Sequence, residues 1–83
     1  MESSLTLYST EGCHLCEMAL DLFQQLGLSD AVKVVDIAYD DELFSRYGVT
    51  IPVAKFRNSE INWPFGSEEL QEWLKVNGIT YDT

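Results

Sequence analysis

A chain of 83 residues suffices for one folded domain, which we expect to span residues 1–83, and leaves no room for a second. Hydrophobic residues form 46% of the chain, which supplies apolar side chains for a core and argues against intrinsic disorder. Fourteen acidic residues against five basic ones give a net charge of −9, so neither nucleic acid nor a membrane surface is an expected partner.

The first expected element is a strand that leads into the only two cysteines. Residues 5–8 alternate apolar and polar side chains and then meet residues 9–12, which predicts a strand ending in a loop. Cys13 and Cys16 follow at the start of a stretch with helical spacing. Cysteines three apart on a helix lie on one face, close enough to form and break a disulfide, so the pair predicts redox chemistry.

The expected helix runs over residues 13–26, and Gly27 is a suitable stop. Its apolar positions recur at helical spacing and are Cys16, Ala19, Leu20, Phe23 and Leu26. In the opening turn of a helix, a cysteine thiolate meets unpaired backbone N–H groups and the positive end of the dipole, which lowers the pKa of the thiol. We therefore expect a thiol that reacts at neutral pH.

A second strand and a short helix follow. Residues 31–37 are rich in β-branched side chains and predict a strand, which completes a right-handed parallel βαβ unit. Asp40 can cap a helix over residues 41–47, and Gly48 can end it.

The last third of the chain predicts a hairpin and a helix. Residues 53–57 and 60–63 are strand-like runs separated by Asn58-Ser59. Ser67 is a good N-cap for a final helix that ends near Asn77-Gly78. The apolar face of that helix consists of Leu70, Trp73 and Leu74. Residues from Ile79 onward are expected to form a loose tail.

The amino terminus suggests a compartment. Residues 1–4 hold no basic region, and no long apolar stretch able to span a bilayer follows. We therefore expect a cytoplasmic protein. We also expect a monomer. In a reducing compartment a cysteine pair is more often catalytic or metal-binding than structural.

The order of these motifs resembles the thioredoxin fold in its smallest version, the glutaredoxins. Residues 5–8, 12–16, 47–53 and 62–65 together look like the small bacterial glutaredoxin-like proteins grouped as DUF836. The resemblance implies an α/β fold with a mixed four-stranded sheet in the order 2-1-3-4 and helices on both faces. It also implies that Pro52 is cis and faces the active cysteine, and that the backbone of Ile51 pairs with bound substrate; an ordinary trans proline is the alternative.

Nucleophile chemistry suggests separate roles for the two cysteines. Cys13, nearest the helix start, would form the mixed disulfide, and Cys16, one turn inward, would resolve it. His14 either stabilises the thiolate when protonated or points to solvent. Glu11 would oppose thiolate formation, so we predict a less acidic Cys13 than in a glutaredoxin with a basic residue there.

The substrate stays open between two classes. Thr50-Ile51-Pro52 matches the segment through which glutaredoxins bind glutathione, and Ser67-Glu68 begins a helix whose N-terminus can hold a carboxylate. However, the basic residue before the cysteines is absent, and the acidic chain repels an anionic tripeptide. We expect a protein or small-molecule disulfide as substrate, no required cofactor, glutathione as a candidate co-substrate, and glutathione or a thioredoxin-reductase-type protein as electron donor.

Other classes of function are alternatives. No metal is expected, because neither a second cysteine pair nor a distant histidine completes the four ligands of zinc. Some glutaredoxins share an iron–sulfur cluster across a dimer, with one cysteine from each chain and glutathione as ligands. The glutathione-binding features of this sequence are weak, which argues against such a cluster here. The main alternative is an interaction or redox-sensing module without glutathione-dependent turnover. Trp63-Pro64-Phe65 either closes the core, which we favour, or forms an apolar rim for a partner.

Overall fold

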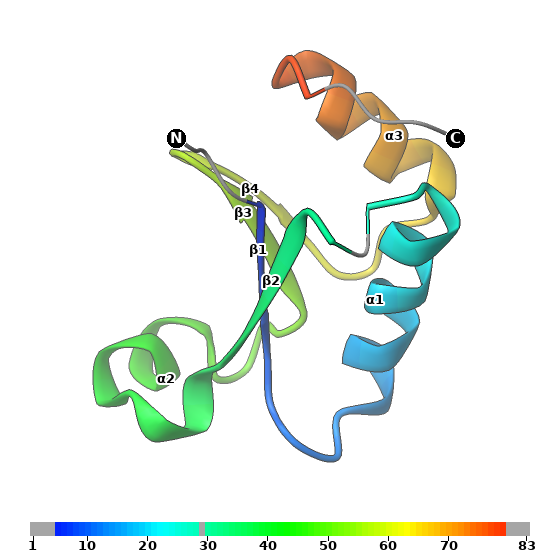
Figure 1. The fold of residues 1–83 in the computed structure, drawn as a ribbon. Helices are drawn as coiled ribbons and strands as arrows, with labels where there is room; N and C mark the ends of the chain where they lie inside the picture. The colour runs from blue at the N-terminus through cyan, green and yellow to red at the C-terminus, as the bar shows by residue number, and fades with distance from the viewer. Residues whose placement is uncertain (1–4, 29, 80–83) are drawn as a thin grey trace.

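The computed structural model describes residues 5–28 and 30–79, which form one four-stranded sheet with helices packed on it (Figure 1). The elements in chain order are β1 (Leu5–Ser9), α1 (His14–Gln25), β2 (Val32–Asp36), the short 3-10 helix η1 (Ile37–Tyr39), α2 (Asp41–Tyr47), β3 (Val53–Phe56), β4 (Ser59–Asn62) and α3 (Ser67–Val76). Within the described ranges, no helix has the length and apolar character needed to cross a bilayer.

The sheet is mixed, and its strand order β2-β1-β3-β4 confirms the expected topology. β1 and β2 are parallel and joined through α1, whereas β3 is antiparallel to both β1 and β4. The C-terminal ends of β1 and β2 therefore lie at the same end of the sheet as the start of β3. The loop to the cysteines leaves from this end, which we call the redox end.

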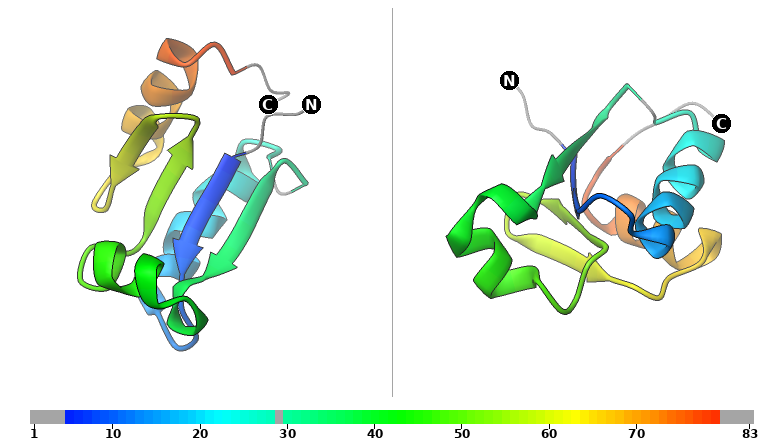
Figure 2. Two further views of the ribbon diagram at one scale, coloured as in Figure 1. Left: turned by 90° about the vertical axis from the view of Figure 1, so that its left-hand side faces the viewer. Right: turned by 90° about the horizontal axis from the view of Figure 1, so that it is seen from below.

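One face of the sheet is covered by α1 and α3 (Figure 2). Leu5 and Leu7 alternate along β1, point into this layer and are buried. Phe23 of α1 meets them there, as do Leu70 and Leu74 of α3, and all three are fully buried. This layer is the main apolar core.

The other face is covered by η1 and α2 (Figure 2), so the helices lie on both faces as expected. The buried cluster there consists of Ile37, Tyr47 and Val53. Tyr8 of β1 stacks on Tyr47, with ring centroids 4.5 Å apart. The Tyr47 hydroxyl donates a hydrogen bond to the carboxylate of Glu60 on β4. Burial raises the pKa of the Tyr47 phenol most, and the hydrogen bond to Glu60 raises it further.

Each strand differs from its expected range by one residue at one or both ends. Phe56 pairs with Ser59, so Arg57 and Asn58 form the hairpin loop, one residue earlier than expected. Arg57 takes a left-handed φ of 57°, which closes the two-residue turn. The second strand ends before Ile37, because the Asp36 carboxylate accepts a hydrogen bond from the N–H of Ala38 at 2.8 Å and caps η1.

The final helix also corrects two expectations. Its N-cap is Gly66, not Ser67, and the Glu69 carboxylate accepts the N–H of Gly66 at 2.9 Å. Ile79 does not lie in a loose tail: Gly78 turns the chain at a φ of 72°, and the Ile79 N–H donates to the Leu74 carbonyl at 2.9 Å. Residues 80–83 of the expected tail lie outside the described residues.

Candidate redox site

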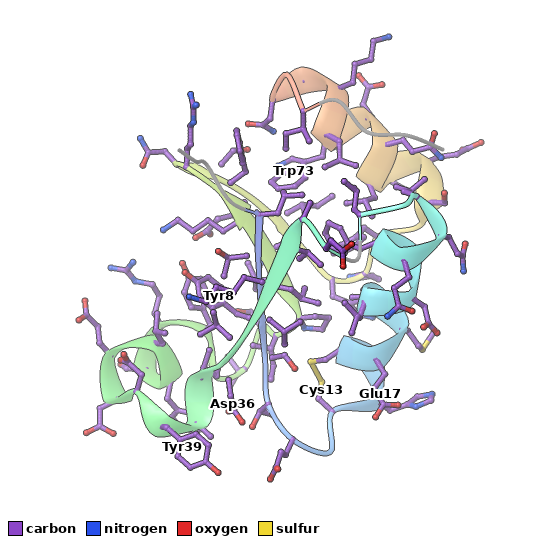
Figure 3. The ribbon with its side chains drawn as sticks, viewed as in Figure 1. Tyr8, Cys13, Glu17, Asp36, Tyr39 and Trp73 are labelled. Atoms are coloured by element: carbon purple, nitrogen blue, oxygen red, sulfur yellow. A yellow bond between two sulfur atoms is a disulfide. The ribbon has the colours of Figure 1, made fainter. Side chains whose placement is uncertain are left out.

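Cys13 and Cys16 form a disulfide at the start of α1 (Figure 3). Their Cα atoms are 5.2 Å apart, within the range that a disulfide requires. α1 begins at His14 rather than at Cys13, and Cys13 is its N-cap, with extended backbone angles. The loop reaches this position through Gly12, whose φ of 75° is the left-handed conformation that glycine adopts without strain.

The two sulfur atoms have different surroundings. The Sγ of Cys13 accepts a hydrogen bond from the N–H of Cys16 at 3.2 Å, one of the N–H groups that the first helical turn leaves without an internal partner. Cys13 is half-buried, whereas Cys16 is only 3% exposed and lies beside the apolar layer under α1. An attacking molecule can therefore approach Cys13 but not Cys16.

The segment Thr50-Ile51-Pro52 lies at the same end of the sheet. The Ile51–Pro52 peptide bond is cis, as the resemblance implied. Tyr8 pairs with Val53 across β1 and β3, so Pro52 comes opposite the end of β1, from which the cysteine loop leaves. The N–H groups of Thr50 and Ile51 both donate to the Tyr47 carbonyl, at 2.9 and 3.1 Å. The Ile51 amide, expected to pair with substrate, thus already has an acceptor in this structure.

The two residues expected to tune Cys13 are both exposed. The His14 side chain is 81% exposed, and its Nδ1 lies 3.9 Å from Glu17 Oε1. This arrangement agrees with the interpretation that His14 points to solvent. Glu11, Glu17 and Cys13 line one hollow of about 280 Å³ at the start of α1. One acidic residue before the motif and one after it thus line the same hollow as Cys13.

Ser67 and Glu68 are the first two residues of α3, and Ser67 already makes a hydrogen bond within the helix. The hydroxyl of Ser67 accepts a hydrogen bond from Gln71 Nε2 at 2.9 Å, and Glu68 is exposed. The Gly66 N–H, at the helix N-terminus where a ligand carboxylate was expected, is already bonded to Glu69. Neither Ser67 nor Glu68 lines the hollow at Cys13.

Two features around Trp63 were not predicted. The Trp63–Pro64 bond is also cis, and Trp63 and Phe65 meet edge-on with ring centroids 5.2 Å apart. Phe65 is buried in the main core, and Trp63 packs against it, which supports the core-closing interpretation of this segment. The second feature is an apolar groove beside Trp63, lined in part by Met18 and Leu22. Its signal was present in the sequence, because apolar residues at 15, 18 and 22 form a second helical stripe beyond the core-facing one.

No group of three or more His, Cys, Asp or Glu side chains in residues 5–28 and 30–79 gathers closely enough to hold a metal ion.

Comparison with known proteins gives a consistent family and fold. A model of the glutaredoxin-like domain (DUF836) matches residues 4–75. The X-ray structure of the Northeast Structural Genomics target protein XcR50 from X. campestris is 36% identical, covers 88% of this chain and 97% of its own, and superposes with a TM-score of 0.79. The solution structure of that protein has the same identity and TM-score and covers 94% of its own chain. A search of the curated proteins finds no match.

Proposed function

The chain belongs to the glutaredoxin-like domain family DUF836 and has a thioredoxin-like fold, and from these premises we propose that it is a thiol-disulfide oxidoreductase. The observation that carries the proposal is the pair itself: Cys13 is the accessible N-cap of α1, and its sulfur both bonds to buried Cys16 and accepts the Cys16 N–H. In the reduced protein the same N–H and the dipole of α1 stabilise a Cys13 thiolate.

The first step is attack by Cys13. Its thiolate bonds to one sulfur of a substrate disulfide, the substrate S–S bond breaks, and the departing thiolate takes a proton from water. The product is a mixed disulfide between Cys13 and the substrate. Cys13 is assigned this step because the other cysteine, Cys16, is buried on the inner face of α1.

The second step is resolution by Cys16. After losing its proton to solvent, the Cys16 thiolate attacks the Cys13 sulfur, the mixed disulfide breaks, and the second substrate thiolate leaves and is protonated. Two electrons have then passed to the substrate, and the Cys13–Cys16 disulfide seen in the structure is the oxidised product. A dithiol protein or two glutathione molecules return the two electrons. A reducing compartment such as the cytoplasm would supply such donors.

Protein disulfides are the favoured substrate class. The Ile51 amide, which was expected to pair with substrate, already bonds to Tyr47, and the Gly66 amide next to the expected carboxylate site at Ser67 and Glu68 already bonds to Glu69. Glu11 and Glu17 line the same hollow as Cys13, and their negative charges would repel the carboxylates of glutathione there. Glutathione is retained as a co-substrate or donor to be tested.

The proposed order is tested by trapping. Cys16→Ser should accumulate a mixed disulfide with an added disulfide substrate, detected as the corresponding mass increase, because no thiol is left to resolve it. Cys13→Ser is the matched control and should trap little, since its remaining thiol is buried. Trapping by Cys13→Ser at the rate of Cys16→Ser would reverse the assignment.

Turnover and electron donor are tested in parallel. The full chain is assayed with glutathione and glutathione reductase, and separately with thioredoxin and thioredoxin reductase, each with a neutral small disulfide as acceptor. Turnover with either donor supports an oxidoreductase, and the faster one identifies its donor class. Absence of turnover with both would favour the interaction or redox-sensing module.

A further inference from the structure

An apolar groove further along the helix that carries the cysteines is left unused by the exchange reaction. This α1 groove has a volume of about 440 Å³ and is lined by Met18 and Leu22 of α1 and by Trp63 and Phe65 of the segment that follows β4. Met18 is 43% exposed. Leu22, Trp63 and Phe65 contribute to the core behind the groove, so its floor is continuous with a rigid layer.

The α1 groove is aligned with the cysteines along one helix. Leu15, Met18 and Leu22 are spaced by three and four residues, which places them on one stripe of α1. Leu15 lies between the two cysteines in sequence and is 44% exposed. An apolar stripe therefore runs from the disulfide into the groove, next to the stripe that begins at Cys16 and packs into the core.

The distance from Cys13 to the groove suits an extended polypeptide. At a rise of about 1.5 Å per residue, Met18 and Leu22 lie about 7.5 and 14 Å from Cys13 along the axis of α1. An extended chain advances about 3.3 Å per residue. A side chain roughly two to four residues from a reacting cysteine would therefore reach the groove.

The charged side chains that line the groove and the hollow at Cys13 are all acidic. Asp21 lines the groove, and Glu11 and Glu17 line the hollow. The basic residues of the chain lie elsewhere, and they are Lys33, Arg46, Lys55, Arg57 and Lys75. The hollow lies on the β2 side of α1 and the groove on the side toward the end of β4, but Glu17 and Asp21 are four residues apart on the exposed surface of the helix. A cationic segment that crosses α1 from Cys13 to the groove is therefore attracted, and an anionic one is repelled.

We propose that the α1 groove receives an apolar side chain of a basic polypeptide substrate, two to four residues from the substrate cysteine that reacts with Cys13. The inference rests on the proposed thiol-disulfide exchange and names its substrate class. Contact of that apolar side chain with Met18 and Trp63 supplies affinity. The acidic side chains that line the hollow and the groove select for Lys or Arg near the substrate cysteine.

The test uses the reduced full-length protein and disulfide-linked dimers of short one-cysteine peptides. The reference peptide has a Leu three residues from the cysteine and flanking Lys residues; one variant replaces Leu by Ser, and another replaces Lys by Glu. The second-order rate constant for reduction of each peptide disulfide is divided by the constant for 2-hydroxyethyl disulfide, a small neutral disulfide, so that changes in the reactivity of Cys13 itself cancel. We expect the Lys peptide to react about tenfold faster than the Glu peptide at low salt, with the gap shrinking as salt is added.

The apolar contact has its own comparison. Replacing Leu by Ser in the peptide should slow the reaction about fivefold, through loss of apolar burial. Met18→Ser in the protein should lower the normalised rate of the Leu peptide by a similar factor. Phe44→Ser is the control, because Phe44 is 57% exposed but lies on α2. Equal losses in both variants, or none in Met18→Ser, would overturn the assignment.

The charge contact is tested by moving one charge. Asp21→Lys should lower the preference for the Lys peptide clearly more than Asp30→Lys, which makes the same charge change at an exposed residue before β2. Equal effects would assign the preference to net charge and overturn the α1 groove as its source. Faster reaction of glutathione disulfide than of the Lys peptide, or a Met18-dependent dimer in sedimentation, would also overturn it.

Failure of this inference can be told apart from failure of the proposed function. Reaction with 2-hydroxyethyl disulfide without any preference among peptides would leave the oxidoreductase intact and remove the docking site. Lack of reaction with every disulfide would remove both.

Discussion

The two faces of the sheet hold the two halves of the site in different ways. The cysteines stand on α1, which packs on a layer of eleven buried residues, whereas α2, which precedes the Thr50-Ile51-Pro52 segment, packs on a cluster of three. The smaller cluster is supplemented by a stacked tyrosine pair and a hydroxyl–carboxylate hydrogen bond. A small, partly polar cluster opens more easily than a large apolar one. The comparison therefore predicts a rigid cysteine helix facing a more readily opened proline segment.

The largest expected effect comes from the main core. Phe23→Ala removes a fully buried ring beneath α1 and should lower the free energy of unfolding by about 3–5 kcal/mol. Urea denaturation followed by tryptophan fluorescence measures it. A loss below about 1 kcal/mol would mean that this layer does not anchor α1.

The next effect concerns the cluster under α2. Tyr47→Phe removes the hydroxyl that donates to Glu60 and should lower the free energy of unfolding by about 1 kcal/mol, because the exposed Glu60 can be hydrated instead. It should also speed hydrogen exchange at the N–H groups of Thr50 and Ile51, which both donate to the Tyr47 carbonyl. Tyr39→Phe, at an 83% exposed tyrosine, is the control and should change neither. Unchanged exchange in Tyr47→Phe would separate this cluster from the proline segment.

The same tyrosine predicts a pH dependence. Because burial raises the Tyr47 pKa in the folded state, its phenol stays protonated above pH 10.0, where an unfolded phenol ionises. This contribution to stability is present below that pH and is lost as the pH rises through the raised folded pKa. The urea midpoint should thus fall more steeply above about pH 10 in the native chain than in Tyr47→Phe. Identical slopes would contradict the shift.

The smallest effect lies outside both faces, in the hairpin turn. Arg57→Asn places a residue that tolerates positive φ where the backbone has a φ of 57°. It also loses the Arg57 guanidinium from above the Phe56 ring, 5.2 Å from its centroid. We expect a net gain of only about 0.5 kcal/mol in the free energy of unfolding, with peptide reduction rates unchanged. A loss greater than about 1 kcal/mol would show that the ring contact outweighs the backbone preference.

Sequence reasoning located the elements well where a local pattern defines them. The helical spacing after Cys13 and the capping residue Asp40 depend on neighbours within one turn, so α1 and α2 were predicted almost to the residue. The hairpin loop was displaced by one residue, because its position depends on which residues pair across β3 and β4. The cap of α3 was misassigned by one residue, because Ser67 already lies in the helix and the Glu69 carboxylate accepts the N–H of Gly66 before it.

By itself, the sequence predicted two cysteines three apart at the start of a helix, with a strand before them, and these features follow from local periodicity and spacing. The position of the Thr50-Ile51-Pro52 segment at the same end of the sheet was implied by the family resemblance and is confirmed by the pairing of β1 with β3. Only the tertiary structure decided how far each cysteine is buried, which amides are already bonded, and that Met18 and Trp63 line one groove. Met18 and Trp63 are far apart in the chain, and their meeting depends on how α1 and the segment after β4 pack on the sheet. The physical reason is that burial and contact between distant residues are properties of packing, which no local pattern specifies.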